Sequence, residues 1–175
     1  MNDNNDFNTL IAVSKIIIYL AIRARALKAG ILPATKHYRE IKRCDAVKIL
    51  IKAAQQECFK ETIETLKKNK TLPMHVKQGE LTLYVDEDEI LRVGGRLESA
   101  NIPFDVKHSM LITSSHALAQ TIAEHFHHAS QHQHEFISHG VIRQERYHIE
   151  NGRELIRKII HKYVDCRKLR GVAAS

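Results

Sequence analysis

Apolar residues recur at helical spacing through the first part of the chain. Residues 7–29 form one such stretch, which ends where Gly30 permits a left-handed stop and Pro33 cannot continue a helix. A second stretch, residues 36–69, has apolar positions every three or four residues, which places them on one stripe of a long helix. We expect these two helices to bury their stripes against each other as a helical hairpin covering residues 1–72.

The pattern then changes from a helical to an alternating one. Residues 81–85 and 90–93 alternate in polarity on either side of the acidic run 86–89, which predicts a β-hairpin with an acidic turn. A further strand is predicted at residues 110–113. Together these segments predict a small β element over residues 73–113.

Helical spacing returns in the last third of the chain. Three helices are predicted, over residues 115–130, 135–145 and 152–164. They define a C-terminal module that we place at residues 114–175. The whole pattern predicts an α+β fold that is mainly helical, with an N-terminal helical hairpin, a small β-hairpin element and a C-terminal three-helix module.

One apolar run, Leu10 to Ile22, resembles a membrane span or a signal peptide at first sight. It is thirteen residues long, it contains Ser14 and Lys15, and acidic residues precede it. A bilayer core of about 30 Å needs about 20 apolar residues, and a signal peptide begins with basic ones. We therefore interpret the run as a buried helix, and we expect an intracellular protein of the nucleus or cytoplasm that is not secreted and does not contact membranes.

The distribution of charge adds two basic ends to this picture. The chain has 27 Lys and Arg against 20 Asp and Glu, a formal net charge of +7. Residues 1–70 hold 14 basic and 7 acidic side chains, residues 71–140 hold 4 and 9, and residues 141–175 hold 9 and 4. Basic ends of this kind indicate contact with nucleic acid or an acidic partner, or simply a solvated helix face.

The three cysteines are Cys44, Cys58 and Cys166. An odd number without short spacings argues against a disulfide framework and for a reducing compartment. Cys44 and Cys58 fall on the apolar stripe of the second predicted helix, so we expect them in the core. Cys166 is then the candidate for chemistry, together with the histidine-rich segment HFHHASQHQHEF, residues 125–136.

The segment ILRVGGRLESANIPFDVKH, from Ile90 to His108, resembles the integrase region of BEL/Pao-type retrotransposon polyproteins. In that family a strand-like LRVGGRL block is followed by an A-x-I/L step and a K-H-P turn, and here Ser109 stands in place of the proline. Upstream, residues 55–66 are similar to the family's Q-x-x-F-x-x-E-I-x-x-L helix. Downstream, residues 142–153 resemble its L-R-x-x-Y-W-I-x-x-G-R segment, with His148 where tryptophan is usual.

The resemblance implies a zinc site, because in that family the histidine-rich segment belongs to an HHCC module with two histidine ligands and a C-x-x-C pair. It places the histidines at His127 and His132, with His128 as an alternative first ligand at H-x3-H spacing. It places the cysteines at positions 163 and 166. Cys166 is present, but Tyr163 replaces the other ligand cysteine.

The missing cysteine leaves two interpretations open. Structural zinc is almost always held by four nitrogen or sulfur ligands, and its binding contributes on the order of 10 kcal/mol to the folding of such modules. Three ligands and a water can also hold zinc, more weakly, and His161, two residues before Tyr163, is a further substitute ligand. The expected cofactor is therefore weakly held Zn²⁺, or none, with the histidines a solvated remnant.

Two other patterns do not predict a metal site. His134 and His139 resemble an H-E-x-x-H motif with one residue too many, so on a helix their side chains lie about 140° apart and cannot share an ion. The acidic run 86–89 lies in a predicted turn, where adjacent carboxylates are usually solvated.

A basic stripe near the C-terminus provides candidate phosphate contacts. Its first members recur at helical spacing, while apolar residues occupy the other side of the same predicted helix. Such a stripe is equally often a soluble surface. The candidate contacts are Arg153, Arg157, Lys158, Arg167 and Lys168.

The resemblance also indicates what the chain would do. Retroelement integrases carry three catalytic carboxylates in a core that follows the zinc module, and this sequence stops at Ser175, before such a core. We therefore expect no catalytic residue, no enzyme activity and no small-molecule substrate. The expected function is a non-catalytic integrase-derived fragment that binds DNA, RNA or protein, including self-association as in an integrase multimer. The alternative is a metal-free structural or protein-interaction remnant without nucleic-acid activity.

Overall fold

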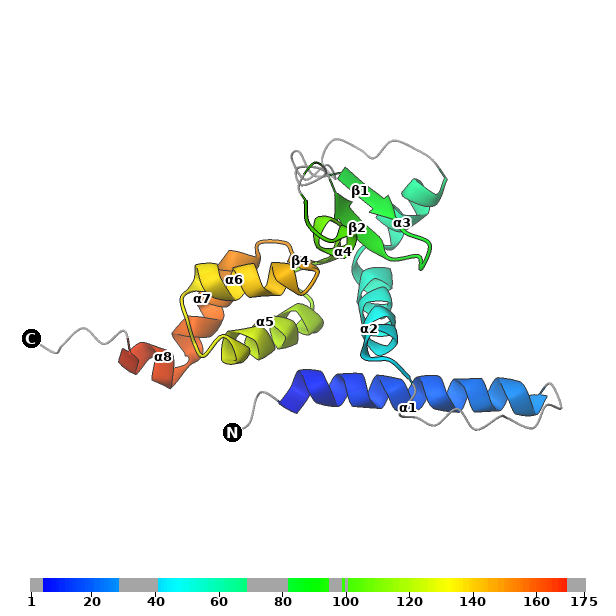
Figure 1. Cartoon of the computed structure of the whole chain (residues 1–175), viewed down its shortest axis with the longest axis horizontal. Coiled ribbons are helices and arrows are strands. Elements are labelled where there is room, and N and C mark those ends of the chain that lie inside the picture. Colours follow the sequence, from blue (N-terminus) through cyan, green and yellow to red (C-terminus); the bar gives the residue numbers. More distant parts are fainter. Residues whose placement is uncertain (1–4, 29–40, 69–81, 95–98, 100, 170–175) are drawn as a thin grey trace, which may run out of the picture.

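The computed structural model describes residues 5–28, 41–68, 82–94, 99 and 101–169. Figure 1 shows helices arranged around a small sheet, which confirms the predicted mainly helical α+β fold. In chain order the elements are α1 (Asn5–Lys28), α2 (Arg43–Cys58), α3 (Lys60–Lys67), β1 (Thr82–Val85), β2 (Leu91–Gly94), α4 (Phe104–Lys107), β3 (Ser109–Ile112), α5 (Ala117–Ala129), α6 (Glu135–Gln144), β4 (Tyr147–Ile149), α7 (Gly152–Lys162) and α8 (Val164–Leu169).

The four strands lie in the order β1-β2-β3-β4. β1 and β2 form the predicted antiparallel hairpin, and β3 adds to it antiparallel, with Arg92 opposite Met110. β4 is not predicted by the sequence, because three residues are too few to show alternation. It pairs parallel to β3, with Leu111 opposite His148. This pairing joins the predicted β element and the predicted C-terminal module in one sheet.

The three predicted C-terminal helices are present as α5, α6 and α7. The structure adds α8, because the extended backbone of Tyr163, with φ −73° and ψ 121°, ends α7 and lets a new helix begin. α5, α6 and α7 share the larger core cluster with α1 and α2. Its aliphatic members include Ile51, Ile122, Ile142 and Ile156.

The second predicted helix is two helices. α2 ends at Cys58 and α3 begins at Lys60, because Phe59 has φ −128° and ψ 21°. Phe59 and α3 pack on the smaller core cluster, which is formed with residues of the first three strands. Several predicted boundaries lie outside the described residues: the helix ends at residues 29 and 69, the stop at residues 30–33, and the helix start at residue 36.

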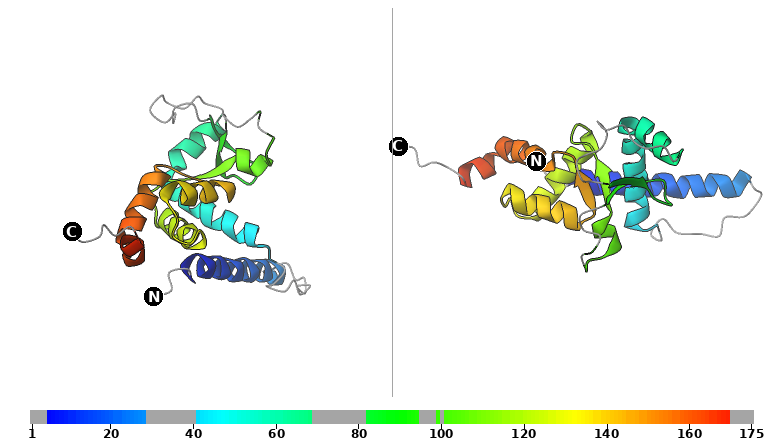
Figure 2. Two further views of the ribbon diagram at one scale, coloured as in Figure 1. Left: turned by 60° about the vertical axis from the view of Figure 1, so that its left-hand side comes forward. Right: turned by 90° about the horizontal axis from the view of Figure 1, so that it is seen from above.

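α1 and α2 pack differently from the predicted hairpin. Figures 1 and 2 show α2 leaving α1 at a steep angle instead of running back along it. The helices meet near the start of each, where Phe7 and Ile11 share a core cluster with Ala46 and Val47. α2 directs the rest of its buried stripe at α5 and β3, so it does not cover α1 along its length.

The prediction that the run 10–22 is buried is therefore wrong. One side of α1 is covered, but the large aliphatic side chains on its other sides are 36% to 57% exposed: Leu10, Val13, Ile16, Ile17, Leu20 and Ile22. Among the described residues, α1 is the one helix that is long and apolar enough to cross a membrane by length and composition. Cys44 and Cys58, also predicted in the core, are exposed because they lie at the two ends of α2.

The buried side chain of Gln55 connects α2 to two strands. It is 1% exposed, and its Nε2 donates to the carbonyl oxygens of Leu91 and Leu111, at 2.8 Å each. Its Oε1 accepts from the Leu91 N–H at 2.8 Å. The β2–β3 register pairs Arg92 with Met110, so Leu91 and Leu111 would be the next pair. The amide of Gln55 thus satisfies the backbone groups where the two strands separate.

Gln55→Ala is expected to lower the free energy of unfolding by about 3 kcal/mol or more, because each buried backbone group left without a partner costs about 1–3 kcal/mol. Urea unfolding followed by circular dichroism measures this loss. Gln56→Ala is the matched control, since Gln56 is the exposed neighbour on the same helix and should change stability by about 0.5 kcal/mol at most. A loss below about 1 kcal/mol for Gln55→Ala would contradict the structural importance of this bridge.

Candidate metal centre

The end of α5 and the residues after it place two histidines together. His127 lies in the last turn of α5 and is fully buried. The chain then reverses through Gln131 and His132, whose φ angles of 55° and 59° lie in the left-handed region, and the His132 N–H donates to the His127 carbonyl oxygen at 3.0 Å. Two successive non-glycine residues in this region are unfavourable and persist where surrounding contacts favour them. The reversal brings His132 back onto His127.

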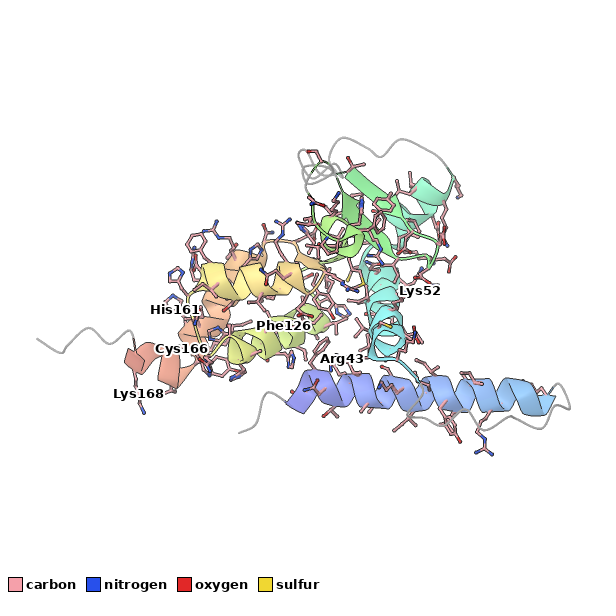
Figure 3. All side chains as sticks on the ribbon, viewed as in Figure 1. Arg43, Lys52, Phe126, His161, Cys166 and Lys168 are labelled. Carbon is pink, nitrogen blue, oxygen red and sulfur yellow. The ribbon has the colours of Figure 1, made fainter. Side chains whose placement is uncertain are left out.

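Cys166 reaches the same place from the far end of the module. α8 carries it to the C-terminal end of α5, where it is 3% exposed (Figure 3). Its Sγ lies 3.2 Å from Nε2 of His127 and 3.3 Å from Nδ1 of His132, and these two nitrogens are 3.3 Å apart. The structure therefore brings together the three residues that the resemblance implied as ligands.

The three donor atoms match one face of a tetrahedral zinc site. Zn–N bonds of about 2.0–2.1 Å and Zn–S bonds of about 2.3 Å place two nitrogens about 3.3 Å apart, and a nitrogen and a sulfur about 3.6 Å apart. The observed separations of 3.2 to 3.3 Å are close to these values. Small side-chain shifts would accommodate an ion, with its fourth position taken by water or another ligand.

A pair of serines holds the other side of the His127 ring. His127 Nδ1 lies 3.1 Å from Oγ of Ser138, a fully buried residue of α6, and Ser138 Oγ lies 3.0 Å from Oγ of Ser130. If Nδ1 donates to Ser138, Nε2 carries the lone pair that faces Cys166 and His132. Outer partners of this kind fix the orientation of a metal-binding imidazole.

His128 and Tyr163 lie on the opposite side of His132. His128 Nδ1 is 3.1 Å from His132 Nε2, and His128 Nε2 is 2.9 Å from the Tyr163 hydroxyl. His132 therefore faces His128 with one nitrogen and the pair of His127 and Cys166 with the other. The alternative that His128 replaces His127 as a ligand would need the reverse orientation of His132, which the structure does not have.

His161 lies apart from the three candidate ligands. It is exposed and lines a separate cavity of about 760 Å³ with His139 and His148. Burial lowers the pKa of His139, and it lowers the pKa of His148 to about 4, so both are neutral at pH 7. His161 does not substitute for the missing cysteine in this arrangement.

The basic stripe on α7 is largely paired with carboxylates. Arg157 donates to both oxygens of Glu135 at 2.8 and 2.9 Å, and Arg153 lies 3.8 Å from the same carboxylate. Lys158 lies 3.0 Å from Glu154. The hydrogen bonds from Arg157 are the main cause that lowers the pKa of Glu135 to about 2. The positive charge available on this face is thus smaller than the sequence suggests.

The other two candidate phosphate contacts belong to α8. Lys168 is exposed (Figure 3), and only the backbone of Arg167 lies within the described part of the chain. α8 contacts α7, which carries the other three candidates.

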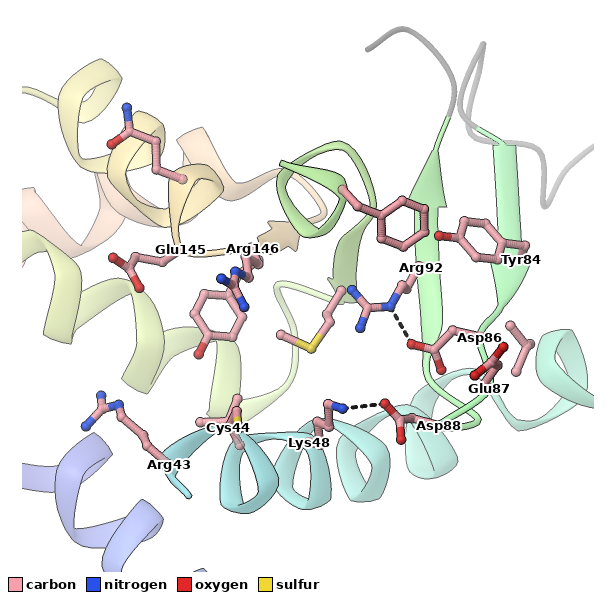
Figure 4. Close-up of a pocket in the computed structure, with 16 residues that line it drawn as sticks. Arg43, Cys44, Lys48, Tyr84, Asp86, Glu87, Asp88, Arg92, Glu145 and Arg146 are labelled. Carbon is pink, nitrogen blue, oxygen red and sulfur yellow. Dashed lines mark hydrogen bonds and ion pairs between the residues drawn. The ribbon is translucent and has the colours of Figure 1, made fainter. Parts of the chain in front are cut away.

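A larger cavity of about 1080 Å³ lies between α2, the β1–β2 hairpin and the segment before β4 (Figure 4). The predicted turn contributes Asp86, Glu87 and Asp88 to its lining, and Glu145 contributes a carboxylate from the segment before β4. Two of the turn carboxylates form ion pairs: Asp86 with Arg92, and Asp88 with Lys48. Asp86 and Asp88 therefore neutralise neighbouring cations.

The sequence did not indicate Ser138 as part of the site. Glu135, Ser138 and Ile142 are the buried residues of α6, at helical spacing. A small polar residue on an otherwise buried stripe needs a partner inside the protein. The buried position of Ser138 was therefore the signal that the sequence offered. It did not identify the partner, because His127 lies on another helix.

The pairing of Glu135 with Arg157 predicts a pH dependence. Because the folded pKa of about 2 lies below the ordinary 4.5, the pairing stabilises the fold fully above about pH 4.5 and loses its effect as the pH falls toward 2. Glu135→Gln is expected to destabilise the protein at pH 7, and urea unfolding should show the difference from the parent narrowing at pH 3. The control is Glu64→Gln on the exposed face of α3, which should follow the parent at both pH values. An unchanged difference between pH 7 and pH 3 would contradict the assignment.

Comparisons with protein-family models, with curated proteins and with solved structures give no match for this chain.

Proposed function

We propose that this chain is a non-catalytic binding module whose C-terminal part is held together by a zinc ion on His127, His132 and Cys166. The observation that carries the proposal is the triangle of two imidazole nitrogens and one sulfur with edges of 3.2 to 3.3 Å. The resemblance to the integrase zinc module supports the same three ligands from the sequence.

Zinc fits these donors better than the hard divalent cations do. Two imidazoles and a thiolate suit zinc, whereas magnesium and calcium prefer carboxylate and carbonyl oxygens. Ser138 and His128 supply the outer contacts, at 3.1 Å from His127 and His132 respectively. Changes in such contacts typically alter metal affinity by about 10- to 100-fold.

The ion would act as a staple between distant parts of the chain. It would link the end of α5 to α8, and the closest ligand pair, His127 and Cys166, is separated by 39 residues. α8 has six residues, which is too short for a helix to be stable by itself in water. A bond network through Cys166 therefore gives α8 its place in the fold.

The proposed partner is nucleic acid, bound by the basic C-terminal part of the chain. The resemblance supports this, as does the excess of basic residues over residues 141–175. Arg157 is set aside because it donates two hydrogen bonds to the buried Glu135 carboxylate. The residues that favour phosphate contact are Arg153, Lys158 and Lys168. The Arg153 and Lys158 side chains are 48% and 69% exposed, and the pair of Lys158 with Glu154 lies on the surface, where such pairs are weak. Assembly with further copies, as in integrase multimers, belongs to the same proposal.

A second candidate, a metal-free structural remnant, is favoured by one observation. The site residues already have hydrogen-bond partners among themselves, including Ser138 for His127 and Tyr163 for His128. Such contacts can satisfy buried polar groups without an ion. Zinc content separates the two candidates directly.

Protein purified without added metal is expected to carry one zinc ion per chain in native mass spectrometry. His132→Ala should lose the ion, because two remaining ligands hold zinc poorly. His161→Ala is the matched control, since it removes an exposed histidine of the same module that lies apart from the site. Tyr163→Cys should raise zinc affinity at least about tenfold by supplying a fourth ligand.

A different pattern of zinc content would reject the proposal. If the parent carries no zinc and Tyr163→Cys carries one ion, the site has lost its function and the metal-free candidate holds. If neither protein takes up zinc, the three donor atoms are not a metal site.

Removal of zinc by a chelator is expected to destabilise the C-terminal module. An ion present at 100 times its dissociation constant stabilises the fold by about 2.7 kcal/mol, which corresponds to about 5–10 °C in Tm for a chain of this size. Hydrogen exchange should increase in α7, α8 and the end of α5, and the strands joined by Gln55 should keep their protection. His132→Ala should not respond to the chelator. A uniform increase in exchange along the parent chain would argue against a local staple.

A further inference from the structure

The exposed apolar residues of α1 follow a heptad repeat. Leu10, Val13, Ile17 and Leu20 are separated by three, four and three residues, which is the spacing of the a and d positions of a coiled coil, and Ala24 continues it. The four large side chains are between 36% and 57% exposed. They lie about a third of a turn away from the buried side of the same helix, so both sides can be covered at once.

This surface is large enough to matter for association. The exposed aliphatic side chains of α1 leave on the order of 400 Å² of apolar area, which is within the range of patches that mark interaction sites on soluble proteins. Two such surfaces, together with the polar residues beside them, would bury on the order of 1,000–1,200 Å² in total, which is the low end for specific interfaces. An interface of this size belongs with weak or transient associations and is smaller than those of obligate dimers.

We propose that α1 packs antiparallel against α1 of a second copy of this chain, with the heptad side chains as the seam. In antiparallel helices, a positions face d positions, so Leu10 faces the partner's Leu20 and Val13 faces the partner's Ile17. The arrangement is a two-fold symmetric contact in which each copy presents the same surface. It requires no change in the packing of α1 on its own core.

The charges of α1 favour the antiparallel orientation. Asp6 lies in the first turn and Arg23 near the other end, and Lys15 lies between them on the side away from the heptad seam. In the register just given, Asp6 comes next to the partner's Arg23 at both ends of the contact. A parallel pair would instead place Arg23 beside the partner's Arg23. The two helix dipoles also oppose each other in the antiparallel pair, which is favourable.

A second copy fits this surface better than a lipid bilayer. Phe7 and Ile11 on the buried side of α1 are 1% and 3% exposed and belong to the main core, so insertion across a membrane would remove them from it. The charged residues Lys15 and Arg23 also interrupt the apolar sequence of α1. The heptad spacing of Leu10, Val13, Ile17 and Leu20 is typical of helix pairing.

The full-length protein is expected to sediment as a dimer, at twice the chain mass of 20.1 kDa, at tens of micromolar concentration in sedimentation equilibrium. Ile17→Glu should give a monomer whose Tm equals that of the parent diluted below its dimer dissociation constant, because the position is exposed within one chain. The matched control is Ile49→Glu on α2, an isoleucine of similar exposure outside the seam, which should stay dimeric. A parent chain that stays monomeric at 100 µM, or a dimer that Ile17→Glu leaves intact, overturns the proposal.

Charge exchange tests the orientation. Arg23→Asp should weaken the dimer about tenfold or less, as two exposed ion pairs are lost and replaced by repulsion, and adding Asp6→Arg should restore it. Failure of the double exchange to restore the dimer would contradict the antiparallel register. Flotation with phosphatidylcholine vesicles is the last arm: a monomer that binds vesicles through Ile17 would show that lipid is the occupant instead.

This inference does not depend on the zinc site. Zinc content measured on the same samples shows whether the metal site is intact, so the failure of one proposal is distinguishable from the failure of the other. Loss of zinc in His132→Ala should leave the dimer in place, because α1 and the three ligands lie in different parts of the fold.

Discussion

The side-chain amide of Gln55 lies where α2, β2 and β3 meet, and it donates to and accepts from backbone groups of the two strands. Its position fixes β3 relative to α2, and β3 in turn pairs parallel with β4. Parallel strands finish at the same end of a sheet. α5 and α7, which follow β3 and β4 in the chain, therefore both begin at that end. His127 lies at the end of α5, and Cys166 lies just after α7. The approach of two residues so distant in sequence therefore depends on the sheet.

Much of the secondary structure could be predicted because it follows from local periodicity. The β1–β2 hairpin and α5, α6 and α7 have apolar residues at regular spacing, and each is present. β4 could not be predicted, because three residues are too few to show a periodic pattern of apolar positions. The break at Phe59 could not be predicted either, because a single non-helical residue leaves the spacing of the apolar positions around it unchanged. The exposure of α1 could not be predicted either. An apolar run indicates that a surface will be buried somewhere, but it does not identify what covers it.

The candidate ligands were predicted from a resemblance, and their arrangement depends on a feature that spacing does not reveal. On a regular helix, His128 and His132 would share a face, which favours them as a pair. α5 ends at Ala129, and the left-handed residues after it carry His132 onto His127 instead. Helical rules therefore fail at the point where the helix stops. Ser138 was missed for a related reason, since its partner is set by the packing of α6 on α5.

Tyr163 has a different role from the cysteine that the resemblance would place there. Its hydroxyl contacts His128, and His128 contacts His132 on the nitrogen that faces away from Cys166. The contact of Tyr163 with His128, and of His128 with Nε2 of His132, thus holds the His132 ring with Nδ1 toward the proposed ion. The change from cysteine to tyrosine would remove a ligand and add a support for one of the remaining three. A cysteine at this position would reverse both effects, so the gain in zinc affinity from the new ligand would be offset in part by a less constrained His132.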